Sequence, residues 1–193
     1  MANSISWVLL VSSALLAATA YILRREPGVA ATHLHFYMHD VYDGPHPTAA
    51  LVVTGRAPLN AAGEAEATSS SSSSSSPRRF GDIAVMNNAL TEGPERGSAR
   101  VGTAQGFTVR VAEQGTVNDL SLYLVFQAGE YAGSSLSVKG RVDTDTGVRE
   151  SVIIGGTGRF RFARGYAFSR SYDYDLAHGG VVEIDVYVQL LRV

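Results

Sequence analysis

The residue of this 193-residue chain that is best placed to do chemistry is Asp40. It closes a run in which apolar residues occupy every second position, so that in a β-strand Phe36, Met38 and Asp40 share one face. Apolar neighbours exclude water from a carboxyl group and favour its protonated form, which suits the group to donate a proton near neutral pH. The alternative is that Asp40 ends the strand and only caps the turn that passes through Gly44. The sequence supports both interpretations equally.

Three histidines, at positions His33, His35 and His39, alternate on the opposite face of the same run. Imidazoles at this spacing can bind a metal ion. No carboxylate shares their register within the run, however, and polar residues are ordinary on the outer face of a barrel. We therefore expect no metal site, and we likewise expect no cofactor.

Other familiar reactive arrangements are missing from the sequence. The chain has no Cys, which excludes disulfides, thiolate chemistry and Cys-ligated zinc. The glycine-rich stretch 155–158 is not followed by Lys-Ser or Lys-Thr and leads into a strand pattern, so it predicts a tight turn rather than a phosphate site. No Gly-x-Ser-x-Gly elbow is present. A net charge of −2 without a basic stripe argues against nucleic-acid binding.

The elements that must position these residues are β-strands. Runs with a period of two follow one another from residue 32 onward, separated by turn signals and without convincing helical periodicity. The runs cover residues 33–43, 49–54, 82–86, 100–113, 119–130, 134–143, 148–154, 160–172 and 181–191. Eight or nine short strands predict an antiparallel barrel or sandwich, and a barrel has the advantage that it leaves no exposed edge.

Two segments depart from this strand pattern. Residues 5–23 are almost wholly apolar or small and include Ala18-Thr19-Ala20, which predicts a signal peptide over residues 1–20. No Lys or Arg precedes the apolar run, so an uncleaved anchor that reaches residue 25 is the alternative. Residues 61–77 contain eight consecutive serines and predict a disordered loop, because such a tract cannot bury enough apolar surface to offset its ordering entropy. The loop interrupts a single predicted barrel domain over residues 32–193.

Several short motifs occur in a fixed order from about residue 32 to 190, and together they are specific although no single one is decisive. They are Phe36-Tyr37-Met38-His39-Asp40, Leu90-Thr91-Glu92-Gly93-Pro94, Ala104-Gln105-Gly106, Gly140-Arg141, Val148-Arg149-Glu150, Gly155-Gly156-Thr157-Gly158-Arg159-Phe160 and Ala163-Arg164-Gly165-Tyr166-Ala167. In order and spacing the set resembles the plant dirigent family.

The resemblance implies an all-β fold, an eight-stranded antiparallel β-barrel after a signal peptide, secreted to the apoplast as a homo-oligomer, with a trimer favoured and a dimer as the alternative. Family members hold two phenoxy radicals of a monolignol such as coniferyl alcohol and impart stereoselectivity on their coupling, which gives optically active lignans in phenylpropanoid metabolism and plant defence. A separate laccase or peroxidase makes the radicals. Some relatives are instead dehydratases of the pterocarpan-forming type.

Two site residues carry over from the family. The acid of the His-Asp motif is Asp40, which the resemblance implies protonates a quinone-methide stage. The arginine of the Val-Arg-Glu motif is Arg149, which would orient the oxygens of the substrate. From its place at the start of an apolar run, Arg149 could also bury its guanidinium beside a carboxylate.

The sequence departs from the lignan-forming pattern at other positions. Where those members have a second pocket Asp this chain has Val142, and Asp143 is one residue out of register, so that its side chain should point to the opposite face. Thr108 and Arg110 replace tyrosines that line the pocket. Two hypotheses follow: a stereo-directing auxiliary or related barrel enzyme acting on phenolics, or a non-catalytic barrel that binds a hydrophobic metabolite.

Overall fold

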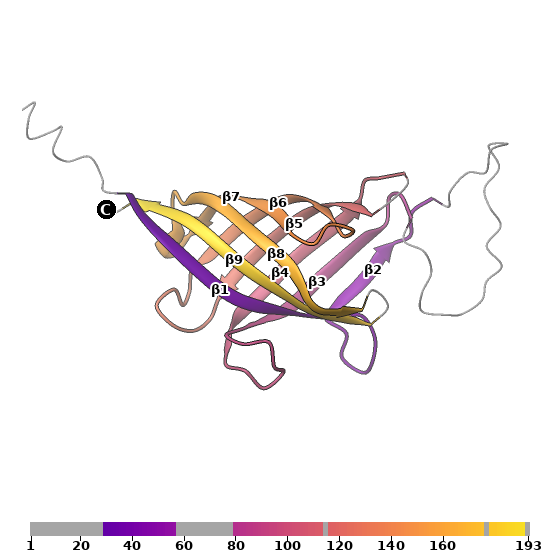
Figure 1. Cartoon of the computed structure of the whole chain (residues 1–193), viewed down its shortest axis with the longest axis horizontal. Helices are drawn as coiled ribbons and strands as arrows, with labels where there is room; N and C mark the ends of the chain where they lie inside the picture. The colour runs from indigo at the N-terminus through magenta and orange to yellow at the C-terminus, as the bar shows by residue number, and fades with distance from the viewer. Residues whose placement is uncertain (1–28, 57–78, 114–115, 176–177, 192–193) are drawn as a thin grey trace, which may run out of the picture. The chain divides into compact units, whose positions relative to one another are not determined.

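The computed structural model describes residues 29–56, 79–113, 116–175 and 178–191 (Figure 1). The predicted signal peptide (1–20) and the whole of the predicted serine-rich loop (61–77) lie outside the described residues, so both remain predictions. The barrel described below is the compact unit Ala31–Leu190, while a second unit comprises Met1–Ala30 and Leu191–Val193. Within the described part of the chain, no helix is long and apolar enough to cross a membrane.

The described residues form nine strands and one short 3-10 helix. These are β1 (Val29–Val41), β2 (Ala49–Val53), β3 (Ile83–Thr91), β4 (Arg100–Arg110), β5 (Val117–Phe126), β6 (Ser135–Asp143), β7 (Arg149–Thr157), η1 (Gly158–Phe160), β8 (Arg164–Asp175) and β9 (Gly179–Leu191). The strand order is β1-β9-β8-β7-β6-β5-β4-β3, and β1 pairs with β3 as well. Eight strands therefore close into an antiparallel barrel, which confirms the predicted fold.

The ninth strand, β2, lies outside this ring of eight. It pairs with β3 from Ala49↔Met86 to Val53↔Ile83, whereas β1 pairs with the other half of β3, at Thr91 to Ala89. Strands β1 and β2 thus share one edge of β3. Figure 1 shows β2 beside β3, and β1 beside β9.

The barrel interior is built from the apolar half of each alternating run. In β9 every second residue from Val182 to Val188 is buried, while the residues between them form the outer face. Phe160 of η1 is fully buried and stacks on Tyr131 at 4.7 Å between ring centroids, with Phe126 at 5.3 Å. Burial of each such large apolar side chain contributes about 1.5–3 kcal/mol, so the alternating pattern dictates which face of each strand points inward.

Two described residues on either side of the predicted serine-rich loop pair with each other. Arg56 and Phe80 form an isolated β-bridge, and the Arg56 amide donates to the Phe80 carbonyl at 2.9 Å. Shortening the segment between these two residues does not require their pairing to change.

We expect deletion of residues 64–76 to leave the free energy of unfolding almost unchanged. Loop-closure entropy varies slowly with loop length, by about 0.6 kcal/mol per doubling. The measurement is urea denaturation of the full-length and deleted proteins side by side. A loss of stability well above this figure in the deleted protein would show that the tract packs on the barrel.

Candidate functional site

Polar side chains collect at one end of the barrel interior. Because neighbouring strands are antiparallel, the C-terminal ends of β4, β6 and β8 meet the N-terminal ends of β5, β7 and β9 at the same end. The C-terminal end of β1 lies there too, and it pairs with β3 at Ala89, next to Asn88. The buried polar residues that this arrangement gathers are Asp40, Asn88, Arg110, Asn118, Arg149 and Ser151. The opposite part of the interior is packed with apolar residues, Phe160 among them. The polar end is therefore the part of the interior that can do chemistry.

Asp40 faces this interior and is only 6% exposed. Its Oδ1 accepts a hydrogen bond from Nδ2 of Asn88 at 3.2 Å, and its Oδ2 accepts one from the Tyr174 hydroxyl at 2.6 Å. The Tyr174 hydroxyl is also hydrogen-bonded to that of Tyr42. The carboxyl group of Asp40 thus bonds to β3 and β8 rather than to the turn at Gly44. Its position suits an internal acid, and that role remains a prediction.

Tyr174 reaches Asp40 because of a β-bulge. Odd-numbered residues of β8, such as Ala167 and Ser169, face the interior, but the register shifts between Ser171 and Asp173, so that the even-numbered Tyr174 faces inward beyond it. Burial, together with Asp40 and Tyr42, raises the pKa of Tyr174 far above its ordinary value. The phenol therefore stays protonated and acts as a hydrogen-bond donor to the acid.

Gly179 allows the turn between β8 and β9 to pass close to Asp40. Its φ is +93°, a left-handed conformation that favours glycine. A Cβ atom at this position would lie 2.2 Å from the backbone oxygen of Asp40. The backbone that carries the acid is therefore packed directly against this turn.

Arg149 begins β7 and is 8% exposed. Its Nη1 donates to Oγ of Ser171 at 3.3 Å, and its Nε makes a long contact with Oγ of Ser169 at 3.5 Å. Burial lowers the pKa of the guanidinium, although the nearby Tyr174 opposes this. Within the described residues the hydrogen-bond partners of Arg149 are hydroxyls, not the carboxylate that its place in the sequence suggested. A buried cation with only neutral partners can still bind an electron-rich oxygen of a ligand.

The structure places Val142 and Asp143 as the sequence indicates. Val142 pairs with Asn118 and continues the inward alternation of Val138 and Gly140. Asp143 accepts hydrogen bonds from the Thr116 hydroxyl at 2.7 Å and from a backbone amide of the following turn at 3.2 Å. The hydroxyl bond is the main reason that the pKa of Asp143 lies below its ordinary value. Asp143 is committed to this turn, so Asp40 is the buried acid of the described interior.

Comparison with known proteins shows to which family this chain belongs. A family profile described as "Dirigent-like protein" matches residues 31–189, which is nearly all of the barrel. The chain belongs to the dirigent family. This confirms the resemblance seen in the sequence motifs.

Relatives within the dirigent family carry two kinds of name. The chain is 42% identical to Dirigent protein 1 of Arabidopsis thaliana over 159 residues, covering 81% of this chain and 78% of that protein. It is 38% identical to Pterocarpan synthase 1 of Glycine max, covering 81% and 77%. The solved structure of the pterocarpan synthase dirigent protein GePTS1 superposes with a TM-score of 0.71 at 36% identity, covering 86% and 87%.

Sequence reasoning missed several residues of this dirigent site. Asn88 lies in register with Met86 and Leu90 of an apolar run, and this break in the alternation was a usable signal. Tyr174 gave no such signal, because the bulge in β8 changes the phase of the alternation just before it. Arg110, singled out only as a replacement for a tyrosine, is buried at 4% exposure and pairs in register with Asn118.

A histidine joins two loops beside the polar end of the dirigent barrel. Nδ1 of His178 lies 2.6 Å from Oδ2 of Asp43, and the Tyr42 amide donates to the His178 carbonyl at 3.2 Å. The hydrogen bond and the charge of Asp43 raise the pKa of His178 above its ordinary 6.5. A group whose pKa is higher in the folded state than in the unfolded state adds to the free energy of unfolding. This added stability is fully present at pH values below the unfolded-state pKa, and it is lost as the pH rises through the folded-state pKa.

We therefore expect His178→Gln to lower the melting temperature relative to wild type below pH 6.5, and to have progressively less effect as the pH is raised above it. Thermal unfolding of both proteins over a pH series provides the measurement. A difference that is constant with pH, or that grows with pH, would contradict this assignment.

Proposed function

We propose that this dirigent-family protein binds a phenolic small molecule at the polar end of its barrel and imparts stereoselectivity on the coupling of monolignol radicals, such as those of coniferyl alcohol, to give optically active lignans. The observation that carries the proposal is a buried acid, Asp40, hydrogen-bonded to Tyr174, with the buried cation Arg149 at the same end of the interior. An eight-stranded barrel can hold one small ligand.

In this reaction the chain orients its substrate and moves a proton. A separate laccase or peroxidase removes one electron and one proton from each phenol, and two of the resulting radicals form the new carbon–carbon bond. The product of coupling carries two quinone-methide groups. At each of them in turn Asp40 donates its proton to the quinone-methide oxygen, a substrate hydroxyl adds to the methide carbon, and the proton released from that hydroxyl restores the acid. Control of which faces join requires only that the partners be held in one orientation.

Arg149 would hold the phenolic oxygen on which charge develops. Among the residues that the structure describes, its two hydrogen-bond acceptors are hydroxyls, so no described acceptor supplies a counter-charge to the buried guanidinium. Preorganised donors of this kind stabilise developing charge more strongly in a water-poor interior than in water. Asp40 and Arg149 bond to separate partners, so a ligand can engage both of them.

A second candidate function is dehydration of the pterocarpan-forming type. It is favoured by Val142, which stands on the interior face where lignan-forming relatives are expected to carry a second acid. Relatives named pterocarpan synthase are 38% identical in sequence, and one solved structure superposes with a TM-score of 0.71. Here Asp40 would protonate a hydroxyl that leaves as water, which gives a protonated quinone methide. A phenolic hydroxyl of the same substrate would then add to its methide carbon and return the proton to Asp40.

We also propose that the protein acts outside the cell, in the apoplast, as a homo-oligomer, most simply a trimer. The outer face of the barrel supports self-association. On it Val152 pairs with Tyr166, and Tyr166 pairs with Tyr187, whose ring it stacks on at 5.1 Å. All three side chains are exposed, and such a contiguous apolar patch is typical of an interface. Sedimentation at several protein concentrations tests the oligomer.

The test of function uses two substrates in parallel. Coniferyl alcohol is oxidised by a one-electron oxidant with and without the protein, and the lignans are resolved by chiral chromatography. A phenolic benzylic alcohol is incubated with the protein alone, and loss of water is followed. An excess of one enantiomer in the first arm supports the coupling function, and turnover in the second supports the dehydratase. Racemic lignan together with no dehydration would overturn both and leave a non-catalytic binding barrel.

A further inference from the structure

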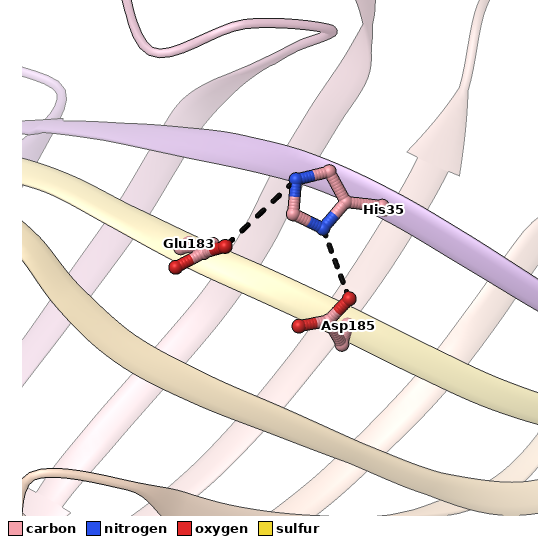
Figure 2. A group of neighbouring side chains, drawn as sticks. All are labelled: His35, Glu183 and Asp185. Atoms are coloured by element: carbon pink, nitrogen blue, oxygen red, sulfur yellow. Dashed lines mark hydrogen bonds and ion pairs between the residues drawn. The ribbon is translucent and has the colours of Figure 1, made fainter.

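The side chains of one histidine and two acidic residues lie together on the outer face of the barrel. They come from two neighbouring strands. His35 comes from β1, and Glu183 and Asp185 come from β9 (Figure 2). Nδ1 of His35 is 2.9 Å from Oδ1 of Asp185, and its Nε2 is 3.9 Å from Oε1 of Glu183. In Figure 2 the imidazole ring lies between the two carboxylates. These side chains point away from the interior that holds Asp40.

The separations between these three side chains match the requirements of a metal ion. One ligand atom from each of the three lies within 4.8 Å of the other two. Zinc bonds to imidazole nitrogen and carboxylate oxygen are about 2.0–2.2 Å long, which places tetrahedral ligand atoms about 3.4 Å apart. The contacts of 2.9 Å and 3.9 Å are made by opposite nitrogens of the His35 ring, and an ion binds only one of them. Binding therefore requires the ring and the carboxylates to turn, so that one nitrogen and one oxygen of each carboxylate face the same point.

The neighbouring residues hold the carboxylates in the orientation that ligation needs. Arg170 of β8 contacts the outer oxygens, with Nη2 at 3.2 Å from Oδ2 of Asp185 and Nε at 3.3 Å from Oε2 of Glu183. Oδ1 and Oε1 are left to face His35. Nε2 of His33 lies 2.8 Å from Oδ1 of Asp185. Partners that orient a ligand in this way are typical of metal sites.

Charge and accessibility also suit a cation. Two carboxylates against one arginine leave a net charge of −1 before the histidines are counted. The side chains of His35, Glu183 and Asp185 are 35%, 19% and 14% exposed, so an ion can enter from solvent.

We propose that His35, Glu183 and Asp185 form a binding site for a divalent transition-metal ion, with Zn²⁺ as its probe, in which His33 is a positioning residue for Asp185. The remaining coordination positions face solvent and are filled by water. An ion at this position joins β1 to its neighbour β9 in the barrel. This site is separate from the proposed reaction and does not depend on it.

The histidines alone did not predict this site, because the run that carries them supplies no carboxylate in register. The pairing of β1 with β9 supplies two, from the other end of the sequence. His39 is not part of the site, since its Nε2 is hydrogen-bonded to Thr91 at 2.7 Å.

The test uses protein without a histidine tag, freed of metal by a chelator and titrated with zinc chloride in a calorimeter near neutral pH. We expect one zinc ion per chain. At a free zinc concentration of about 100 times Kd, the melting temperature should rise by about 5–10 °C. His35→Gln should weaken binding at least 100-fold, and His33→Gln should weaken it about 10- to 100-fold.

The matched control is His178→Gln, which removes an exposed imidazole that is also paired with a carboxylate, that of Asp43. It should bind zinc as wild type does. Glu183→Gln provides a second ligand variant, and circular dichroism checks the fold of each protein. Absence of saturable binding by wild type would overturn the proposal, as would equal affinities of wild type, His35→Gln and Glu183→Gln.

Discussion

We expect Asp40→Asn to fold as wild type does and to lose the proposed ability to bias the product. Asparagine keeps the shape of the side chain and an oxygen for the hydrogen bond from Tyr174, but it has no proton to give. General acids typically contribute about 100- to 10,000-fold in rate, so the uncatalysed background should dominate in the variant. The measurements are the enantiomeric excess of the lignan and the rate of dehydration, each compared with wild type.

The control for this substitution is Asp145→Asn, which changes an exposed acid in the turn between β6 and β7. It should leave both activities unchanged. If Asp40→Asn keeps full selectivity and rate, the acid has only a structural role. Melting curves of both variants show whether any loss of activity comes from unfolding.

We expect Arg149→Met to lower the rate of the reaction without lowering the stability of the protein. Loss of one preorganised donor to a developing oxyanion typically costs about 100- to 1,000-fold in rate, and we expect a loss of this size in whichever activity wild type shows. We expect no loss in the free energy of unfolding, because the methionine relieves the burial of a cation whose hydrogen-bond partners are two neutral hydroxyls. Steady-state kinetics and urea denaturation of the same preparation measure the two effects.

Arg141→Met is the matched control, since Arg141 is exposed on β6. It should not appreciably change the rate or the free energy of unfolding. A marked loss of stability in Arg149→Met would contradict the account and show that the arginine is mainly a structural element of the barrel.

The fold could be predicted because its signal is local and repeated. Each strand of a barrel has one dry and one wet face, so alternation such as that of residues 182–188 appears directly in the sequence. The one-residue offset between Val142 and Asp143 could be interpreted for the same reason, since it reverses the face. These inferences need no knowledge of which strands are neighbours.

The contacts of the site depend on information that alternation does not carry. Tyr174 follows a bulge that reverses its face, and the bulge has no clear mark in the sequence. His35 and Asp185 are 150 residues apart in the sequence, and only the pairing of β1 with β9 brings them together. The sequence allowed Arg149 to lie beside a carboxylate, but its hydroxyl partners are serines of β8, and serines in strands are too common to be singled out.

The central claim is that a phenolic ligand lies inside the barrel between Asp40 and Arg149. The most direct test is a crystal structure of the protein with a phenolic substrate analogue that cannot react. We predict a ligand oxygen within hydrogen-bond distance, about 2.6–3.2 Å, of the Asp40 carboxyl group, and a phenolic oxygen at the same distance from the Arg149 guanidinium. A ligand bound only on the outer face, or one inside the barrel that contacts neither residue, would contradict the claim.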